Sequence, residues 1–125
     1  MKIAILEDDD QVASGLARVL RYLGHESFTA RDVREARALL TKHEDIGAAM
    51  ADLGLKNSES GHDFLIWLNE YRPGVQRILT SALERPASFV EDPPRQLFLR
   101  KPFGHDTLKT IFGTSTAAIR RKGEQ

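Results

Sequence analysis

Short apolar runs and longer amphipathic segments alternate five times along the chain, and this alternation limits the possible folds more than any other feature. The runs have the length of strands and lie at residues 2–6, 26–30, 46–53, 75–79 and 97–99. In every following segment except the fourth, apolar residues recur every three or four positions, as on one face of a helix. Strands that alternate with helices predict an α/β fold, with crossover helices covering a parallel sheet.

The first two helical segments carry clear start and stop signals. Residues 12–23 are followed by Gly24, which we expect to end a helix in a left-handed turn. Asp32 and Glu35 form a capping signature ahead of the second segment. These signals place helices directly after the first and second strands.

The fourth crossover departs from this pattern. Residues 84–95 (ERPASFVEDPPR) contain three prolines, and each removes a backbone donor and disfavours helix at the preceding residue. We expect a shortened or irregular fourth helix of at most about two turns. Residues 108–119 again have apolar positions at helical spacing, so a fifth helix is expected there despite Gly113.

Length and composition restrict the classes of function. At 125 residues the chain is long enough for one domain with a substantial core. Its 18 basic and 18 acidic residues cancel, so no overall field attracts nucleic acid or an anionic membrane. There is no cysteine, and no apolar run approaches the roughly 20 residues of a membrane span. We therefore expect a cytoplasmic protein without disulfides, direct nucleic-acid contacts or membrane contacts.

Polar side chains gather at the carboxyl ends of the predicted strands, the edge where open parallel sheets bind ligands. These residues are Glu7, Asp8, Asp9, Asp10, Asp52, Thr80, Ser81 and Lys101. Four adjacent carboxylates raise their own electrostatic free energy unless a positive group lies nearby. A hard cation such as Mg²⁺ suits this edge, because it typically takes one or two carboxylates and keeps waters and a phosphate as further ligands.

Four short motifs, in this order, resemble the receiver domain of two-component response regulators. LEDD at 6–9 is similar to the acidic-pair motif, and MADLGL at 50–55 is similar to the phosphoacceptor motif. ILTSA at 78–82 is similar to the switch-hydroxyl motif, and LRKPF at 99–103 to the Lys-Pro motif. Each motif lies at a strand end, and the resemblance covers nearly the whole chain, about residues 1–120.

The resemblance implies a fold and a role for the chain. The fold would be flavodoxin-like and doubly wound, with a five-stranded parallel sheet in the order 2-1-3-4-5. One receiver domain would span residues 1–120, followed by a polar tail at 121–125. We expect a stand-alone receiver, similar to chemotaxis regulators, because nothing after the last predicted helix could form an output domain. Its partners would be a bacterial histidine kinase or a histidine phosphotransfer protein of a phosphorelay, and a downstream protein target.

The resemblance also implies the chemistry of the site. Asp52 would be the nucleophile that accepts a phosphoryl group and becomes an aspartyl phosphate. Asp8, Asp52 and the backbone carbonyl of Gly54 would ligate Mg²⁺ or Mn²⁺, and Glu7 would support the metal through a water. Lys101 and the metal would hold the charge on the phosphoryl oxygens.

Two further residues belong to the switch that the resemblance implies. Thr80 would bond a phosphoryl oxygen once that group arrives, and the rotamer of Phe98 would couple to the Thr80 hydroxyl. The peptide bond before Pro102 would be cis. Asp9 or Asp10 is then left to cap the first helix and favour its positive end.

The chain departs from the family's pattern after the phosphoacceptor as well as in the fourth crossover. Lys56 stands four positions after Asp52, where a proline is usual, and Gly61 comes one position later than usual. The irregular crossover alters a surface through which receivers commonly contact a partner. Gly54 and Ala82 are too small to shield a phosphoryl group, so we expect moderate to fast autodephosphorylation.

Two other functions compete with this interpretation. A phosphorylation-independent pseudo-receiver would use the same fold as an interaction scaffold, although the complete set of site residues argues against it. An Mg²⁺-dependent phosphatase with an aspartate nucleophile usually carries a second Asp two residues later, where this chain has Gly54. We therefore expect no enzyme activity beyond the domain's own phosphorylation and dephosphorylation.

Overall fold

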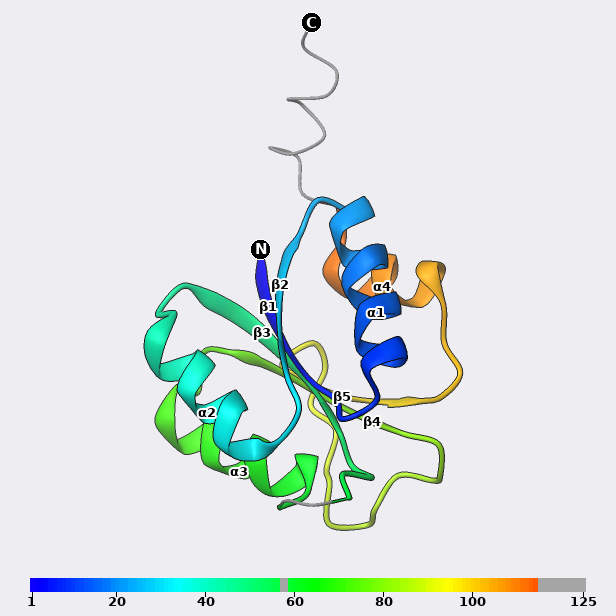
Figure 1. Ribbon diagram of the computed structural model, residues 1–125. Coiled ribbons are helices and arrows are strands. Elements are labelled where there is room, and N and C mark those ends of the chain that lie inside the picture. The colour runs from blue at the N-terminus through cyan, green and yellow to red at the C-terminus, as the bar shows by residue number, and fades with distance from the viewer. Residues whose placement is uncertain (57–58, 115–125) are drawn as a thin grey trace, which may run out of the picture.

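A parallel sheet with helices on both faces makes up the computed structural model, which describes residues 1–56 and 59–114 (Figure 1). The elements are β1 (Lys2–Leu6), α1 (Asp10–Tyr22), β2 (Glu26–Ala30), α2 (Val33–Lys42), β3 (Ile46–Asp52), α3 (Gly61–Tyr71), β4 (Gln76–Ser81), β5 (Gln96–Arg100) and α4 (His105–Phe112). None of the helices within these two ranges is long and apolar enough to cross a membrane.

The five strands lie in the order β2-β1-β3-β4-β5, and all neighbouring pairs are parallel. The predicted α/β class and strand order are therefore confirmed. Helices α1 and α4 cover one face of the sheet, and α2 and α3 cover the other (Figure 1). The connections after β1 and β3 thus leave toward opposite faces, which opens a crevice beyond the carboxyl ends of these strands.

Alternate side chains of the central strands fill two cores, one on each face of the sheet. On β1, Ala4 and Leu6 pack with α2 and α3, whereas Ile3 and Ile5 pack with α1 and α4. All four side chains are at most 2% exposed. A strand buried on both faces has a continuous apolar sequence, which is why the apolar run of β3 predicted a central strand.

The starts of the first two helices, and the end of the first, are as the sequence predicted. Asp9 caps α1, because its Oδ1 accepts hydrogen bonds of 2.9 and 3.2 Å from two N–H groups of the first turn. Asp32 caps α2 by accepting a 2.8 Å hydrogen bond from the N–H of Glu35. Gly24 has a φ of 90°, so the predicted left-handed turn after α1 is confirmed.

The last helix ends earlier than predicted. α4 stops at Phe112, and Gly113 follows with a φ of 68° and donates its N–H to the carbonyl of Lys109. A glycine in the left-handed region ends a helix, so the expectation of a helix through Gly113 is wrong. Ile119 and the tail at 121–125 lie outside the described residues.

The fourth crossover is irregular, as predicted, but it contains no helix at all, whereas a shortened helix was expected. Phe89 anchors this segment, since its side chain is 1% exposed and packs in the core with residues of α3. Glutamine side chains satisfy its carbonyls: Gln96 Nε2 donates to Val90 at 2.6 Å, and Gln76 Nε2 donates to Pro94 at 2.7 Å. A buried ring and side-chain hydrogen bonds thus replace the helix that the prolines disfavour.

Candidate functional site

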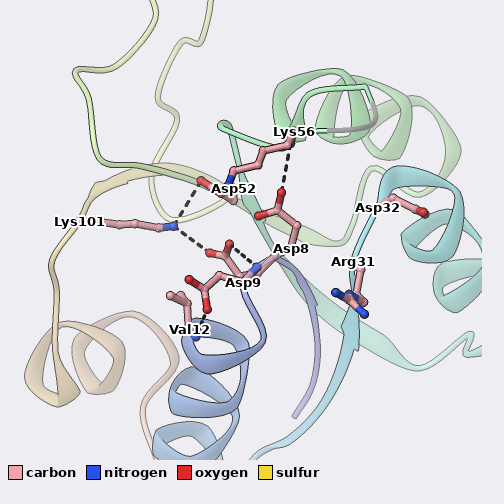
Figure 2. A pocket seen from close by; sticks show the side chains of 9 residues that line it. Asp8, Asp9, Val12, Arg31, Asp32, Asp52, Lys56 and Lys101 are labelled. Atoms are coloured by element: carbon pink, nitrogen blue, oxygen red, sulfur yellow. Dashed lines mark hydrogen bonds and ion pairs between the residues drawn. The ribbon is translucent and has the colours of Figure 1, made fainter.

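A cavity of about 620 Å³ lies beyond the carboxyl ends of β1 and β3 (Figure 2). It is lined by Glu7, Asp8, Asp9, Val12, Arg31, Asp32, Asp52, Lys56 and Lys101. All of these residues except Val12 are charged, so the cavity suits an ionic ligand. The predicted acids Glu7, Asp8, Asp9 and Asp52 and the predicted Lys101 are among them, whereas Asp10 is not.

Three carboxylates stand close enough together to share a metal ion. Glu7 and Asp8 follow β1 and Asp52 ends β3, and one oxygen of each lies within 4.8 Å of the others. Glu7 and Asp52 are only 3% and 8% exposed, which raises the cost of leaving their charges unneutralised. Mg²⁺ is held in proteins by one or two carboxylates together with waters, so this set of oxygen donors fits that ion.

Lys101 is the positive group that the buried carboxylates require. Its Nζ donates a 2.8 Å hydrogen bond to Oε1 of Glu7 and lies 3.4 Å from Oδ1 of Asp52 (Figure 2). The peptide bond between Lys101 and Pro102 is cis, as predicted. One ammonium group from the segment after β5 therefore joins the ends of β1 and β3.

Burial and this contact change the pKa of both partners. Burial raises the pKa of Glu7; the hydrogen bond from Lys101 opposes the rise, the charge of Asp52 adds to it, and the net change is upward. Burial lowers the pKa of Lys101, but the hydrogen bond to Glu7 and the charge of Asp52 outweigh burial and raise it. The site thus holds a firmly protonated amine beside a carboxylate that is harder than usual to ionise.

The two carboxylate oxygens of Asp52 have different surroundings. Oδ1 accepts a 3.3 Å hydrogen bond from the N–H of Gly54 and lies beside Lys101. Oδ2 accepts no hydrogen bond from any residue in the ranges 1–56 and 59–114. One oxygen is therefore held in place, and the other is free to attack an electrophile or to bind a cation.

The start of α3 packs directly against the backbone of Asp52. A Cβ atom on Gly61 would lie 2.3 Å from the carbonyl oxygen of Asp52 and 2.7 Å from its carbonyl carbon. Ser60 and Asp63 form a capping box at this end of α3, in which each side chain accepts the backbone N–H of the other. The absence of a side chain at Gly61 therefore lets a well-capped helix begin immediately behind the candidate nucleophile.

The two predicted switch residues do not line the cavity. Thr80 pairs with Asp52 between β3 and β4, but its buried hydroxyl donates to the carbonyl of Ala51 at 3.5 Å. Phe98 on β5 is partly buried and packs against the core on the α2 and α3 face. The fold therefore brings Thr80 next to Asp52 without directing its hydroxyl at the carboxylate.

Three further charged residues, Arg31, Asp32 and Lys56, line the cavity although no motif singled them out for a role in it. The N–H of Lys56 donates a 3.1 Å hydrogen bond to Oδ2 of Asp8, which a proline at this position could not do. Arg31 Nε lies 3.5 Å from Oδ1 of Asp10, and Asp32 follows Arg31 at the end of β2. The contact between Lys56 and Asp8 had one signal in the sequence, which is the lysine at a position where the receiver motif has a proline.

No protein-family model and no curated protein matches the chain, whereas many solved structures do. The chemotaxis protein CheY4 of Vibrio cholerae has a TM-score of 0.77 at 21% identity, over 87% of this chain and 92% of that one. A response regulator receiver domain protein of Clostridium thermocellum has a TM-score of 0.74 at 22% identity, over 98% and 96%. The response regulator TrrA of Thermotoga maritima, in complex with Mg²⁺-BeF, has a TM-score of 0.76 at 20% identity, over 87% and 93%.

The chain has the receiver-domain fold. Similarities at such low sequence identity show only the fold. For the fold, they confirm the resemblance predicted from the four motifs. TrrA has also been solved in complex with the histidine kinase ThkA. In this fold, the charged cavity lies at the crevice where the strand order reverses, which is where doubly wound sheets bind their ligands.

Proposed function

We propose that this receiver domain is a phosphorylation-controlled signalling switch whose phosphoacceptor is Asp52. The observation that carries the proposal is the meeting of four groups in one cavity. Glu7, Asp8 and Asp52 converge within 4.8 Å, and Lys101 contacts Glu7 and Asp52. Acidic residues at strand ends often only cap helices, but a lysine joined to two buried carboxylates is suited to stabilising a phosphoryl group on one of them.

Asp52 is the nucleophile in this proposal. Its Oδ2 forms a bond to phosphorus while the bond from phosphorus to the donor breaks, and the donor leaves with the electron pair of that bond. From a phosphohistidine, the leaving group is a neutral imidazole whose other nitrogen carries the proton. The contacts of Oδ1 with Gly54 and Lys101 fix the carboxylate, so the free oxygen faces the donor in one orientation.

Cations neutralise the charge that the transferred group brings. A phosphoryl group carries roughly two negative charges near neutral pH. Lys101, already 3.4 Å from Oδ1 of Asp52, is placed to hold one phosphoryl oxygen. Asp8, Asp52 and the carbonyl of Gly54 would hold Mg²⁺ or Mn²⁺, which supplies further charge neutralisation when bound. Glu7 would support that ion through a water.

Thr80 and Phe98 carry the response in this proposal. The hydrogen bond from the Thr80 hydroxyl to Ala51 is 3.5 Å long, so little free energy is lost when the hydroxyl turns toward a phosphoryl oxygen. Phe98 lies on β5, the strand that pairs with the strand of Thr80. The product is a changed protein surface for a downstream partner.

The comparisons support the choice of partner. The TrrA structures show that a receiver fold can hold Mg²⁺-BeF and can contact a histidine kinase. A histidine kinase or a histidine phosphotransfer protein is accordingly the proposed phosphoryl donor. The cytoplasmic location and the output through protein contacts, both expected from the sequence, belong to the same proposal.

Binding of beryllofluoride, which mimics a phosphoryl group on a carboxylate, tests this proposal. We expect calorimetry with Mg²⁺ to show beryllofluoride binding by the wild type and none by Asp52→Asn. The matched control is Asp32→Asn, since Asp32 lines the same cavity outside the carboxylate cluster and asparagine still caps α2. This control should bind as the wild type does, and a wild type that fails to bind would overturn the proposal.

The two competing functions give different results. An interaction scaffold would bind no beryllofluoride although it is folded, and its partner would bind Asp52→Asn as well as it binds the wild type. A phosphatase would release phosphate from a small ester over many turnovers. We expect no such turnover, because Gly54 stands where these enzymes carry their general acid.

A further inference from the structure

We propose that Lys56 is a second phosphoryl-binding cation, which approaches the phosphoryl group from a different segment than Lys101 and prolongs the life of the aspartyl phosphate. This inference rests on the proposed function, because it assigns a role at the same site. It concerns a residue of the chain that stands where the receiver motif has a proline and therefore no charge.

The backbone around Lys56 is fixed at the mouth of the cavity. Its N–H donates a 3.1 Å hydrogen bond to Oδ2 of Asp8, which ties the connection after β3 to the end of β1. From this point the side chain extends across the cavity toward Asp52, as Figure 2 shows. The ammonium group therefore approaches the candidate nucleophile from a different segment than Lys101 does.

The Lys56 ammonium is also uncommitted, unlike the other cations of the cavity. Among the residues that the structure describes, it forms no ion pair with any carboxylate. Lys101 already contacts Glu7 and Asp52, and Arg31 lies against Asp10 outside the carboxylate cluster. An exposed amine that points into a charged cavity without a partner there is free to receive an arriving anion.

A phosphoryl group on Asp52 would supply that anion. Hydrolysis ends the phosphorylated state: a water oxygen bonds to phosphorus, the bond to the Asp52 oxygen breaks, and the carboxylate keeps the electron pair while the water's protons pass to the released phosphate and the solvent. Gly54 and Ala82 have no long side chains to slow this attack. Lys56 supplies both a charge on the phosphoryl oxygens and a side chain over the open side of the site.

Two variants of Lys56, compared with a matched control, test the role of the ammonium. Lys56→Met keeps the length of the side chain and the N–H that binds Asp8, so it removes the charge alone. We expect its affinity for beryllofluoride in the presence of Mg²⁺ to be weaker by at least about fivefold, as for the loss of a charge-assisted contact. The half-life of its aspartyl phosphate, formed with acetyl phosphate, should shorten by about the same factor. Lys56→Arg should restore both values, since arginine also binds phosphate.

Arg31→Met is the matched control, because it removes another positive charge from the lining of the same cavity. We expect its beryllofluoride affinity to change by less than about twofold. Urea unfolding of each variant checks that the fold is unchanged. Wild-type values for Lys56→Met, or an equal loss in Arg31→Met, would overturn the role of Lys56 and leave the proposed function intact. A wild type that binds no beryllofluoride would overturn both.

Discussion

Replacing Gly61 with alanine tests how much the close packing of α3 against the backbone of Asp52 contributes to stability. The general effect of alanine in a helix is measured separately by a control. The added Cβ would lie 2.3 Å from the carbonyl oxygen of Asp52, whereas ordinary contacts begin at 3.4 Å, so α3 or β3 must move by about 1 Å. Forcing extra atoms into a packed region typically costs about 1–3 kcal/mol. Because the opposing atoms are backbone of a central strand, we expect Gly61→Ala to lower the free energy of unfolding by about 3 kcal/mol.

Urea unfolding followed by circular dichroism measures this change, with Gly15→Ala as the matched control. Gly15 lies within α1, and a Cβ there would meet no heavy atom within 4 Å. Alanine at this position should therefore stabilise the protein by about 0.5–1 kcal/mol. The rate of phosphorylation of Gly61→Ala should also fall by at least about tenfold, because Asp52 is displaced. A stability within about 0.5 kcal/mol of the wild type would refute the reasoning.

Three further predictions address the rest of the fold and the buried acid. Arg72 donates from its guanidinium to four carbonyls between the end of α2 and the start of β3. Arg72→Met should therefore cost about 3 kcal/mol in urea unfolding, and Arg72→Lys should recover less than half of that loss. Phe89→Ala should cost about 3–4 kcal/mol by the same method, whereas Leu83→Ala, at a side chain that is 72% exposed, should stay within about 0.5 kcal/mol of the wild type. The folded-state pKa of Glu7 is raised above 4.5, so its contribution to stability is present below that pH and is lost as the pH rises through the folded pKa. In metal-free buffer, unfolding free energies should thus show the wild type losing stability relative to Glu7→Gln as the pH rises above about 4.5, and a constant difference would contradict this.

The positions of the strands and of the cavity could be predicted because both depend on local patterns in the sequence, whereas the strand order was implied by the resemblance to receiver domains. Strand-length apolar runs placed the strands, and the motifs implied the order in which they pair. The polar residues at the carboxyl ends of β1 and β3 then had to meet, since the carboxyl ends of parallel strands share one edge. Their chemical roles stay predictions, because geometry alone does not test them.

Other features of the structure depend on tertiary packing or on the preference of a single residue, and the periodic patterns in the sequence did not predict them. The burial of Phe89 was not predicted, because the prolines around it showed only that a helix was disfavoured and not which side chain would fill the space. The end of α4 was misjudged because apolar spacing was weighed above the conformational preference of Gly113. The direction of the Thr80 hydroxyl, toward Ala51, is a rotamer set by its surroundings in the folded protein.

The measurement that tests the central claim most directly is the intact mass of the protein after incubation with acetyl phosphate. With Mg²⁺ present, we expect the wild type to gain the mass of one phosphoryl group. The gain should be absent when the metal is chelated, absent in Asp52→Asn and retained in Asp32→Asn. A wild type that gains no mass, or an Asp52→Asn variant that gains as much as the wild type, would contradict the assignment of Asp52 as the phosphoacceptor.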